Sequence, residues 1–139
     1  MKVRGDRNDS YPGRPPRQPY STRSVCNRKI FTEILGMNEV RHRLDYPAIF
    51  VSDGVVMITL WQAKEPTTAT AFNRQINIVL HHVALTVADA EQRDVLCARL
   101  KKTTGVEIEF TPESLGSNPF HHMMRRIPGG VRVESIMPG

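Results

Sequence analysis

Cysteine is scarce in this chain, which has only Cys26 and Cys97 among 139 residues. Two cysteines far apart in the sequence have neither the density of a disulfide-stabilised scaffold nor the spacing of a cysteine metal site. We therefore predict two reduced, partly buried thiols that play no part in chemistry.

Long hydrophobic runs are also absent. No apolar stretch is long enough to span a membrane, and no short apolar segment near the N-terminus has the form of a secretory signal. Because 40% of the residues are hydrophobic, the chain can still build the core of one compact domain. We expect a soluble, cytoplasmic protein.

An excess of positive charge is absent outside the first 29 positions. That segment holds eight Lys or Arg against two Asp, a net charge of +6; since the whole chain carries +5, the remainder carries −1. A basic arm can bind phosphates, but no basic stripe with interleaved aromatic residues follows it. We therefore do not expect a nucleic-acid partner.

The N-terminal segment is rich in proline, with Pro12, Pro15, Pro16 and Pro19 close together. Proline lacks the amide proton of a sheet ladder and disfavours helix in the residue before it. We predict that residues 1–24 form a basic, disordered tail and that residues 25–139 form a single domain.

Within that domain, two stretches carry the same order of signals: a helix ending at glycine, extended segments, a glycine turn and a last apolar strand. The pattern predicts an α+β fold of two strand-helix-three-strand modules, with an incomplete first module (25–63), a linker (64–76) and a second module (77–139). The expected helices are 25–35 and 90–102, and the expected strands are 48–51, 55–61, 79–87, 107–110, 120–127 and 131–136. Residues 41–44 are too polar to assign.

Three motifs carry a resemblance to a known family: His82-Val83-Ala84-Leu85-Thr86-Val87, Phe31-Thr32-Glu33-Ile34-Leu35-Gly36-Met37, and Ile127-Pro128-Gly129-Gly130-Val131-Arg132-Val133-Glu134. Over residues 28–137 the chain resembles the vicinal oxygen chelate superfamily. This superfamily includes glyoxalase, bleomycin-resistance proteins, fosfomycin-resistance enzymes and extradiol dioxygenases.

The resemblance implies paired modules that form a U-shaped mixed sheet with a cleft, where a divalent metal such as Zn, Mn, Fe or Ni binds. His82 and Glu134 match metal ligands of the second module, and Glu134 is also the candidate catalytic residue. The first module departs from the pattern, because Thr59 replaces a ligand and its first strand is missing near Pro15–Pro19.

A third ligand could come from His122, His121, His42 or another subunit, since sequence alone does not fix which of the adjacent histidines faces the cleft. Three ligands and an open position are usual in catalytic sites. The purely structural alternative is that the histidines are hydrogen-bonded and that Glu134 pairs with Arg132 or Arg126.

Ligand-binding candidates outside this group are Met57, Thr59 and Trp61, which alternate onto one strand face, and Arg132. An aromatic wall beside methionine suits a flat or cationic organic molecule. The incomplete first module would leave a sheet edge uncovered, which predicts a homodimer.

We therefore expect a small-molecule-binding protein, with a metal-dependent lyase, transferase or dioxygenase as one form. The alternative is a metal-free protein that sequesters a ligand, as in bleomycin resistance. A scaffold or nucleic-acid role based on the basic tail is a third class.

Overall fold

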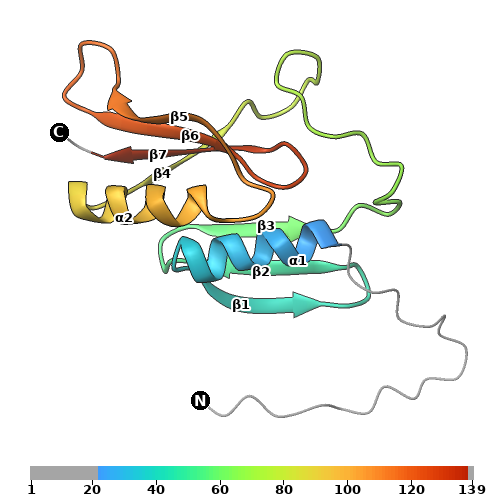
Figure 1. Ribbon diagram of the computed structural model, residues 1–139. Coiled ribbons are helices and arrows are strands. Elements are labelled where there is room, and N and C mark those ends of the chain that lie inside the picture. Colours follow the sequence, from blue (N-terminus) through green and yellow to red (C-terminus); the bar gives the residue numbers. More distant parts are fainter. Residues whose placement is uncertain (1–21, 138–139) are drawn as a thin grey trace, which may run out of the picture.

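The computed structural model describes residues 22–137, and it contains two sheets and two helical segments (Figure 1). The chain order is α1 (Thr22–Lys29), η1 (Ile30–Ile34), β1 (Asn38–Arg43), β2 (Ala48–Ser52), β3 (Met57–Trp61), β4 (Val83–Thr86), α2 (Ala90–Lys101), β5 (Glu107–Ser114), β6 (His121–Arg126) and β7 (Arg132–Met137). This arrangement confirms the predicted α+β class. Most of the predicted tail (1–24) and the missing first strand fall on residues 1–21, which lie outside the described part; residues 22–24, predicted as disordered, instead form the start of α1.

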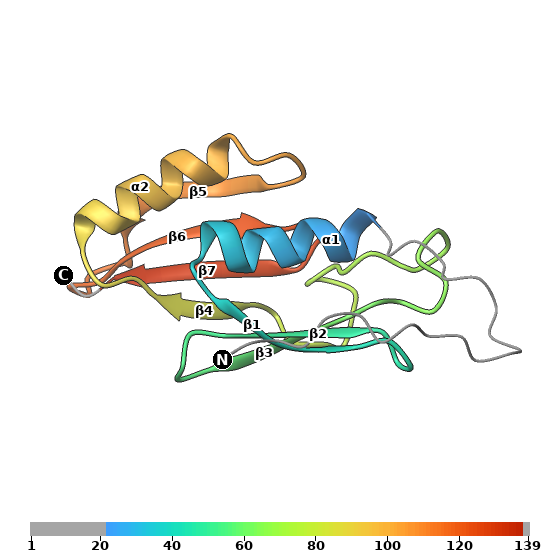
Figure 2. The ribbon, with the colours of Figure 1, turned by 90° about the horizontal axis from the view of Figure 1, so that it is seen from below.

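The second half has the predicted strand-helix-three-strand order. Its sheet runs β4-β7-β6-β5, with β4 parallel to β7 and the other neighbours antiparallel. The first half forms an antiparallel sheet in the order β1-β2-β3. Figure 2 shows helix α1 running between these two sheets.

One apolar core joins the halves. Ile30 and Phe31 of η1, Ile49 and Val51 of β2, and Val133 of β7 belong to a single buried cluster. Ile58 and Leu60 of β3 and Leu85 of β4 pack against it. A smaller cluster of Cys97, Leu100 and Met123 holds α2 on the second sheet. Both cysteines are free, as predicted.

The first helix differs from the predicted span of 25–35. It begins at Thr22, and its last turn is a π-helix in which the amide of Leu35 donates to the carbonyl of Ile30 at 2.9 Å. Gly36 follows with φ of 73°, a backbone conformation that glycine adopts at no steric cost. Residues 41–43, left unassigned above, belong to β1, whose polar sequence suits an exposed edge strand.

The predicted strand 79–87 is too long, because β4 begins only at Val83. Its single neighbour β7 starts at Arg132, and Val83 already pairs with Val133, so residues before 82 have no ladder partner. A local turn precedes them: the carbonyl of Asn73 accepts from the amides of Ile76 and Asn77, and Asn77 Oδ1 accepts from the amide of Asn73.

The linker is held against the second sheet at the Pro-Gly-Gly turn. The amide of Phe72 donates to the carbonyl of Gly129 at 3.0 Å. A Cβ on Gly130 would lie 2.7 Å from the Phe72 carbonyl oxygen, and φ there is 89°. Only glycine fits this position, and it allows the linker to approach the sheet face that carries the candidate site.

Candidate functional site

Glu134 lies between two imidazoles on the helix-free face of the second sheet. Its Oε1 is 2.6 Å from His122 Nδ1, and its Oε2 is 3.2 Å from His82 Nε2. The side chain of Glu134 is 8% exposed, that of His122 12% and that of His82 34%. These three residues, predicted as metal ligands from the sequence, therefore form one contact group.

Strand register explains the grouping. Val133 points into the apolar core, so its neighbour Glu134 points to the opposite face of β7. Met124 of β6 pairs with Glu134, and His122, two residues earlier, lies on the same face. His121 lies on the other face, so the structure places His122 beside the carboxylate. The ring of Phe110 contacts His122, with centroids 4.8 Å apart.

The cluster continues into a polar network through His81. The Nδ1 atoms of His81 and His82 are 2.8 Å apart, and Arg132 Nη1 lies 3.3 Å from His81 Nε2. Partial desolvation, and then the positive charge of Arg132, lower the pKa of His81, which favours its neutral form. Arg132 Nη1 also lies 3.2 Å from His81 Nδ1, so a continuous series of contacts runs from Arg132 through His81 and His82 to Glu134.

Arg132 is anchored by Glu109 of β5. Its Nη2 donates to Glu109 Oε2 at 2.6 Å and its Nε at 3.0 Å, and the two side chains are only 7% and 13% exposed. Hydrogen bonding to Arg132 lowers the pKa of Glu109, although burial opposes this shift. The alternative that Glu134 pairs with Arg132 or Arg126 is wrong, because those arginines contact Glu109 and Glu107.

The remaining predicted ligand-binding residues lie on the other sheet. Met57, Thr59 and Trp61 alternate with the core-packed Ile58 and Leu60 on β3. Trp61 is 50% exposed and contacts the ring of Tyr46, with centroids 4.5 Å apart. Among the described residues, the ring contacts of Trp61 are with Tyr46 and Phe50 of the first sheet and not with the histidine and glutamate group, which Arg132 adjoins.

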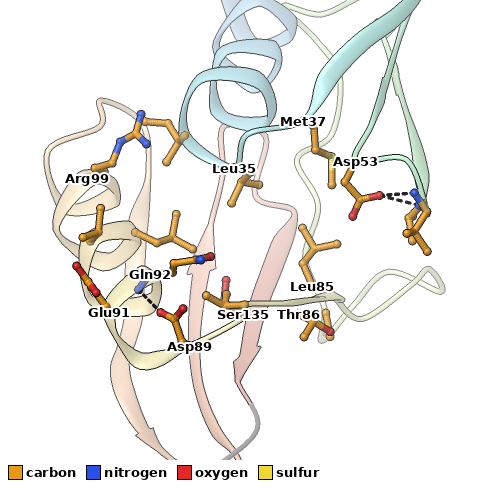
Figure 3. Close-up of a pocket in the computed structure, with 17 residues that line it drawn as sticks. Leu35, Met37, Asp53, Leu85, Thr86, Asp89, Glu91, Gln92, Arg99 and Ser135 are labelled. Atoms are coloured by element: carbon orange, nitrogen blue, oxygen red, sulfur yellow. Dashed lines mark hydrogen bonds between the residues drawn. The ribbon is translucent and has the colours of Figure 1, made fainter.

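A cavity of about 800 Å³ lies along the free edge of β4. Leu35, Met37, Val56, Leu85 and Leu96 give it an apolar wall. Asp89, Glu91, Gln92 and Arg99 reach it from the α2 side, with Met37 and Asp53 opposite (Figure 3). Ser135 lines it from β7, on the face opposite to Glu134, so the cavity is distinct from the polar cluster.

Sequence reasoning missed three members of the network. Glu109 is a partner of Arg132, and Arg74 in the linker contacts Glu109 at 3.3 Å, across 35 positions of sequence. Nothing in the local pattern marks such a pair. His81 could have been found, since it directly precedes His82 at the start of a strand.

Comparisons with known proteins bear on the fold. No family model matches the sequence, and no curated protein sequence matches it. A glyoxalase-like protein from Bacillus halodurans is similar in structure, with a TM-score of 0.68, 21% identity, and coverage of 84% of this chain and 86% of that one.

Two further structures extend this finding. A glyoxylase/bleomycin resistance protein/dioxygenase domain from Frankia sp. has a TM-score of 0.66 at 24% identity, covering 83% of each chain. The fosfomycin resistance protein FosX from Listeria monocytogenes has a TM-score of 0.62 at 14% identity, covering 83% of this chain and 84% of that one. The chain therefore has the fold of the vicinal oxygen chelate superfamily, as its motifs predicted.

A divalent metal, which this fold implies, can be tested against the residues present. Two imidazole nitrogens and a carboxylate are a donor set that Zn²⁺, Mn²⁺ and Fe²⁺ accept in proteins. As the side chains stand, each imidazole faces a different oxygen of Glu134, and within residues 22–137 no three such side chains surround one point that could hold an ion. The residue types fit; binding would exchange the two imidazole contacts for bonds to the ion.

Proposed function

We propose that this protein binds a small organic molecule at the helix-free face of its second sheet, and that His82, His122 and Glu134 hold a divalent ion there. The observation that carries the proposal is the convergence of both imidazoles on one buried carboxylate. A buried carboxylate with two imidazole partners is already desolvated and oriented, as a metal-binding or proton-transferring group requires.

In this proposal each residue of the site has its own role. Glu134 is the group that would accept a proton from a bound molecule, and its Oε2 lies on the more accessible side, beside the 34% exposed His82. His122 contacts the other oxygen, and the ring of Phe110 packs against the imidazole of His122. A bound Zn, Mn, Fe or Ni ion would supply Lewis acidity toward oxygen atoms of the substrate. A lyase, transferase or dioxygenase reaction is compatible with this set of groups.

Elemental analysis of protein purified without chelator tests the proposal. We expect close to one equivalent of a divalent metal in the wild type and its loss in His82→Ala. His121→Ala is the matched control, because His121 adjoins His122 on β6 but lies on the opposite face. Equal metal content in His82→Ala and the wild type, or no uptake after incubation with all four ions, would overturn the metal site.

A second candidate function is metal-free sequestration of a ligand, and the apolar cavity beside β4 favours it. Its volume of about 800 Å³ is that of a site for a drug-sized molecule. In this case ligands found by fragment screening would shift methyl resonances of Leu35, Leu85 and Leu96 without added metal. Shifts confined to His82 and His122 would favour the first candidate.

We also propose that the protein forms a homodimer. In the described part of the chain, β4 pairs only with β7 and β3 only with β2, so each offers a free edge. Free edges are normally covered by another segment or subunit. Light scattering at micromolar concentration should give twice the chain mass, and a monomer mass would contradict the proposal. No helix within residues 22–137 is long and apolar enough to cross a membrane.

A further inference from the structure

Three guanidinium groups gather around one carboxylate beside the candidate site. Arg132 holds Glu109 with two short hydrogen bonds, whereas Arg74 Nη1 and Arg126 Nε reach Glu109 Oε1 only at 3.3 and 3.4 Å. Arg74 and Arg126 are 38% and 43% exposed, against 7% for Arg132. A buried arginine thus lies behind two accessible ones.

The donors of this group outnumber the acceptors near them. Each guanidinium offers five N–H donors, and the acidic partners are Glu109 and Glu107, the second of which contacts Arg126. The Nε atom of Arg126 is buried and has no hydrogen-bond acceptor. Among the charged groups in direct contact, three guanidiniums therefore face two carboxylates, while the nearby Glu134 contacts His82 and His122 instead.

The position of the group relates it to Glu134. Arg132 precedes Glu134 by two residues on β7, so their side chains lie on the same face about 7 Å apart along the strand. Arg126 pairs with Arg132 across β6 and β7 and lies on that face too. A small molecule that reaches Glu134 can therefore place a second group among the arginines.

We propose that Arg74 and Arg126, with Arg132 behind them, bind the anionic group of the ligand, a carboxylate, phosphonate or phosphate. The planar guanidinium presents paired donors that match such oxygens. This inference deepens the proposed function by naming the substrate class as small organic anions, and it rests on that function only for what lies at Glu134.

The experiment is an NMR titration of the full-length protein, observing the arginine Nε–H resonances. Phenylphosphonate and benzoate are the anionic probes, and benzyl alcohol is the uncharged probe of similar size. We expect saturable shifts with the anions alone, and about tenfold weaker binding in Arg74→Gln and in Arg126→Gln, because each removes a charge-assisted contact. The stronger of the two anions identifies the preferred headgroup.

Two further variants sharpen the titration. Arg43→Gln is the matched control, since Arg43 is a 37% exposed arginine paired with Asp45 on the other sheet. Glu109→Gln should bind the anions several-fold more tightly, because the competing carboxylate is gone. Equal affinity in Arg74→Gln, Arg126→Gln and Arg43→Gln, or binding of benzyl alcohol as tight as that of the anions, would overturn the anion site. Metal content is measured separately, so the two proposals fail independently.

Discussion

The two faces of the β4-β7-β6-β5 sheet are built from alternating residues of the same strands, yet their buried side chains differ: one face buries mainly apolar residues and the other buries charged ones. The face under α2 carries Met123 and Val133 in apolar clusters, together with one buried arginine, Arg125. The opposite face carries Glu134 and Arg132, equally buried but each with a charged or imidazole partner. The face under α2 stabilises the fold through apolar packing, whereas the opposite face holds paired polar groups that can take part in chemistry.

Arginine shows the contrast most directly. Arg125 is fully buried and donates one hydrogen bond to Ser135 Oγ at 2.7 Å, while its Nε and Nη2 atoms have no partner. Burial lowers its pKa to about 10. Arg132 is also buried but is held by Glu109. Arg125 therefore lowers the stability of the fold, because its charge is buried without an ionic partner, whereas Arg132 is part of a paired network.

The largest effect is expected from shortening a side chain on the packed face. Leu100 of α2 is completely buried against Met123, and Leu100→Ala removes those contacts and leaves a cavity. We expect the free energy of unfolding to fall by about 2–5 kcal/mol, measured by urea denaturation. The metal content should stay as in the wild type, because the polar face is untouched.

The control for this prediction lies on the same helix. Val95 is 53% exposed, and Val95→Ala should change the free energy of unfolding by less than about 0.5 kcal/mol. If Leu100→Ala were as mild as Val95→Ala, packing under α2 would not be what stabilises this face.

The sequence predicts those features of the two faces that depend on neighbouring residues, and it does not predict those that depend on contacts between residues far apart in the chain. The alternation along β7 and the turn at Gly129 and Gly130 are local, so the strand could be predicted directly, whereas the candidacy of Glu134 came from the resemblance to the superfamily. Whether His121 or His122 faces Glu134 depends on pairing between β6 and β7, which sequence alone does not fix.

Long-range features were beyond prediction for the same reason. The contact of Arg74 with Glu109 joins the linker to β5 and exists only in the folded chain. The length of β4 depends on where its neighbour β7 begins, so the apolar residues before His81 misled the strand prediction. The burial of Arg125 was not predicted, because nothing nearby in the sequence indicates it.

An intermediate effect, opposite in sign on the two faces, is expected when each arginine is replaced by methionine. Arg125→Met replaces an unpaired buried cation with an apolar side chain of similar length, and should raise the free energy of unfolding by about 1–3 kcal/mol. Arg132→Met leaves Glu109 without its closest partner and should lower it by about 1–3 kcal/mol. Urea denaturation of both variants at pH 7 tests this pair, and effects of equal sign would contradict the contrast.

The smallest effect concerns pH and Glu109, which faces Arg132, Arg74 and Arg126. Because its pKa is lowered in the folded protein relative to 4.5, its contribution to stability is complete above that value and is lost as the pH falls through the folded pKa. Glu109→Gln should therefore be less stable than the wild type by about 1–2 kcal/mol at pH 7, with the difference shrinking below pH 4.5. Glu91→Gln, which removes an exposed carboxylate on α2, is the control for the change in net charge. If the difference in the free energy of unfolding between Glu109→Gln and the wild type stayed constant from pH 7 down to acid unfolding, the ionised carboxylate would not be stabilised by its arginines. The polar face would then be ordered by packing, as the other face is.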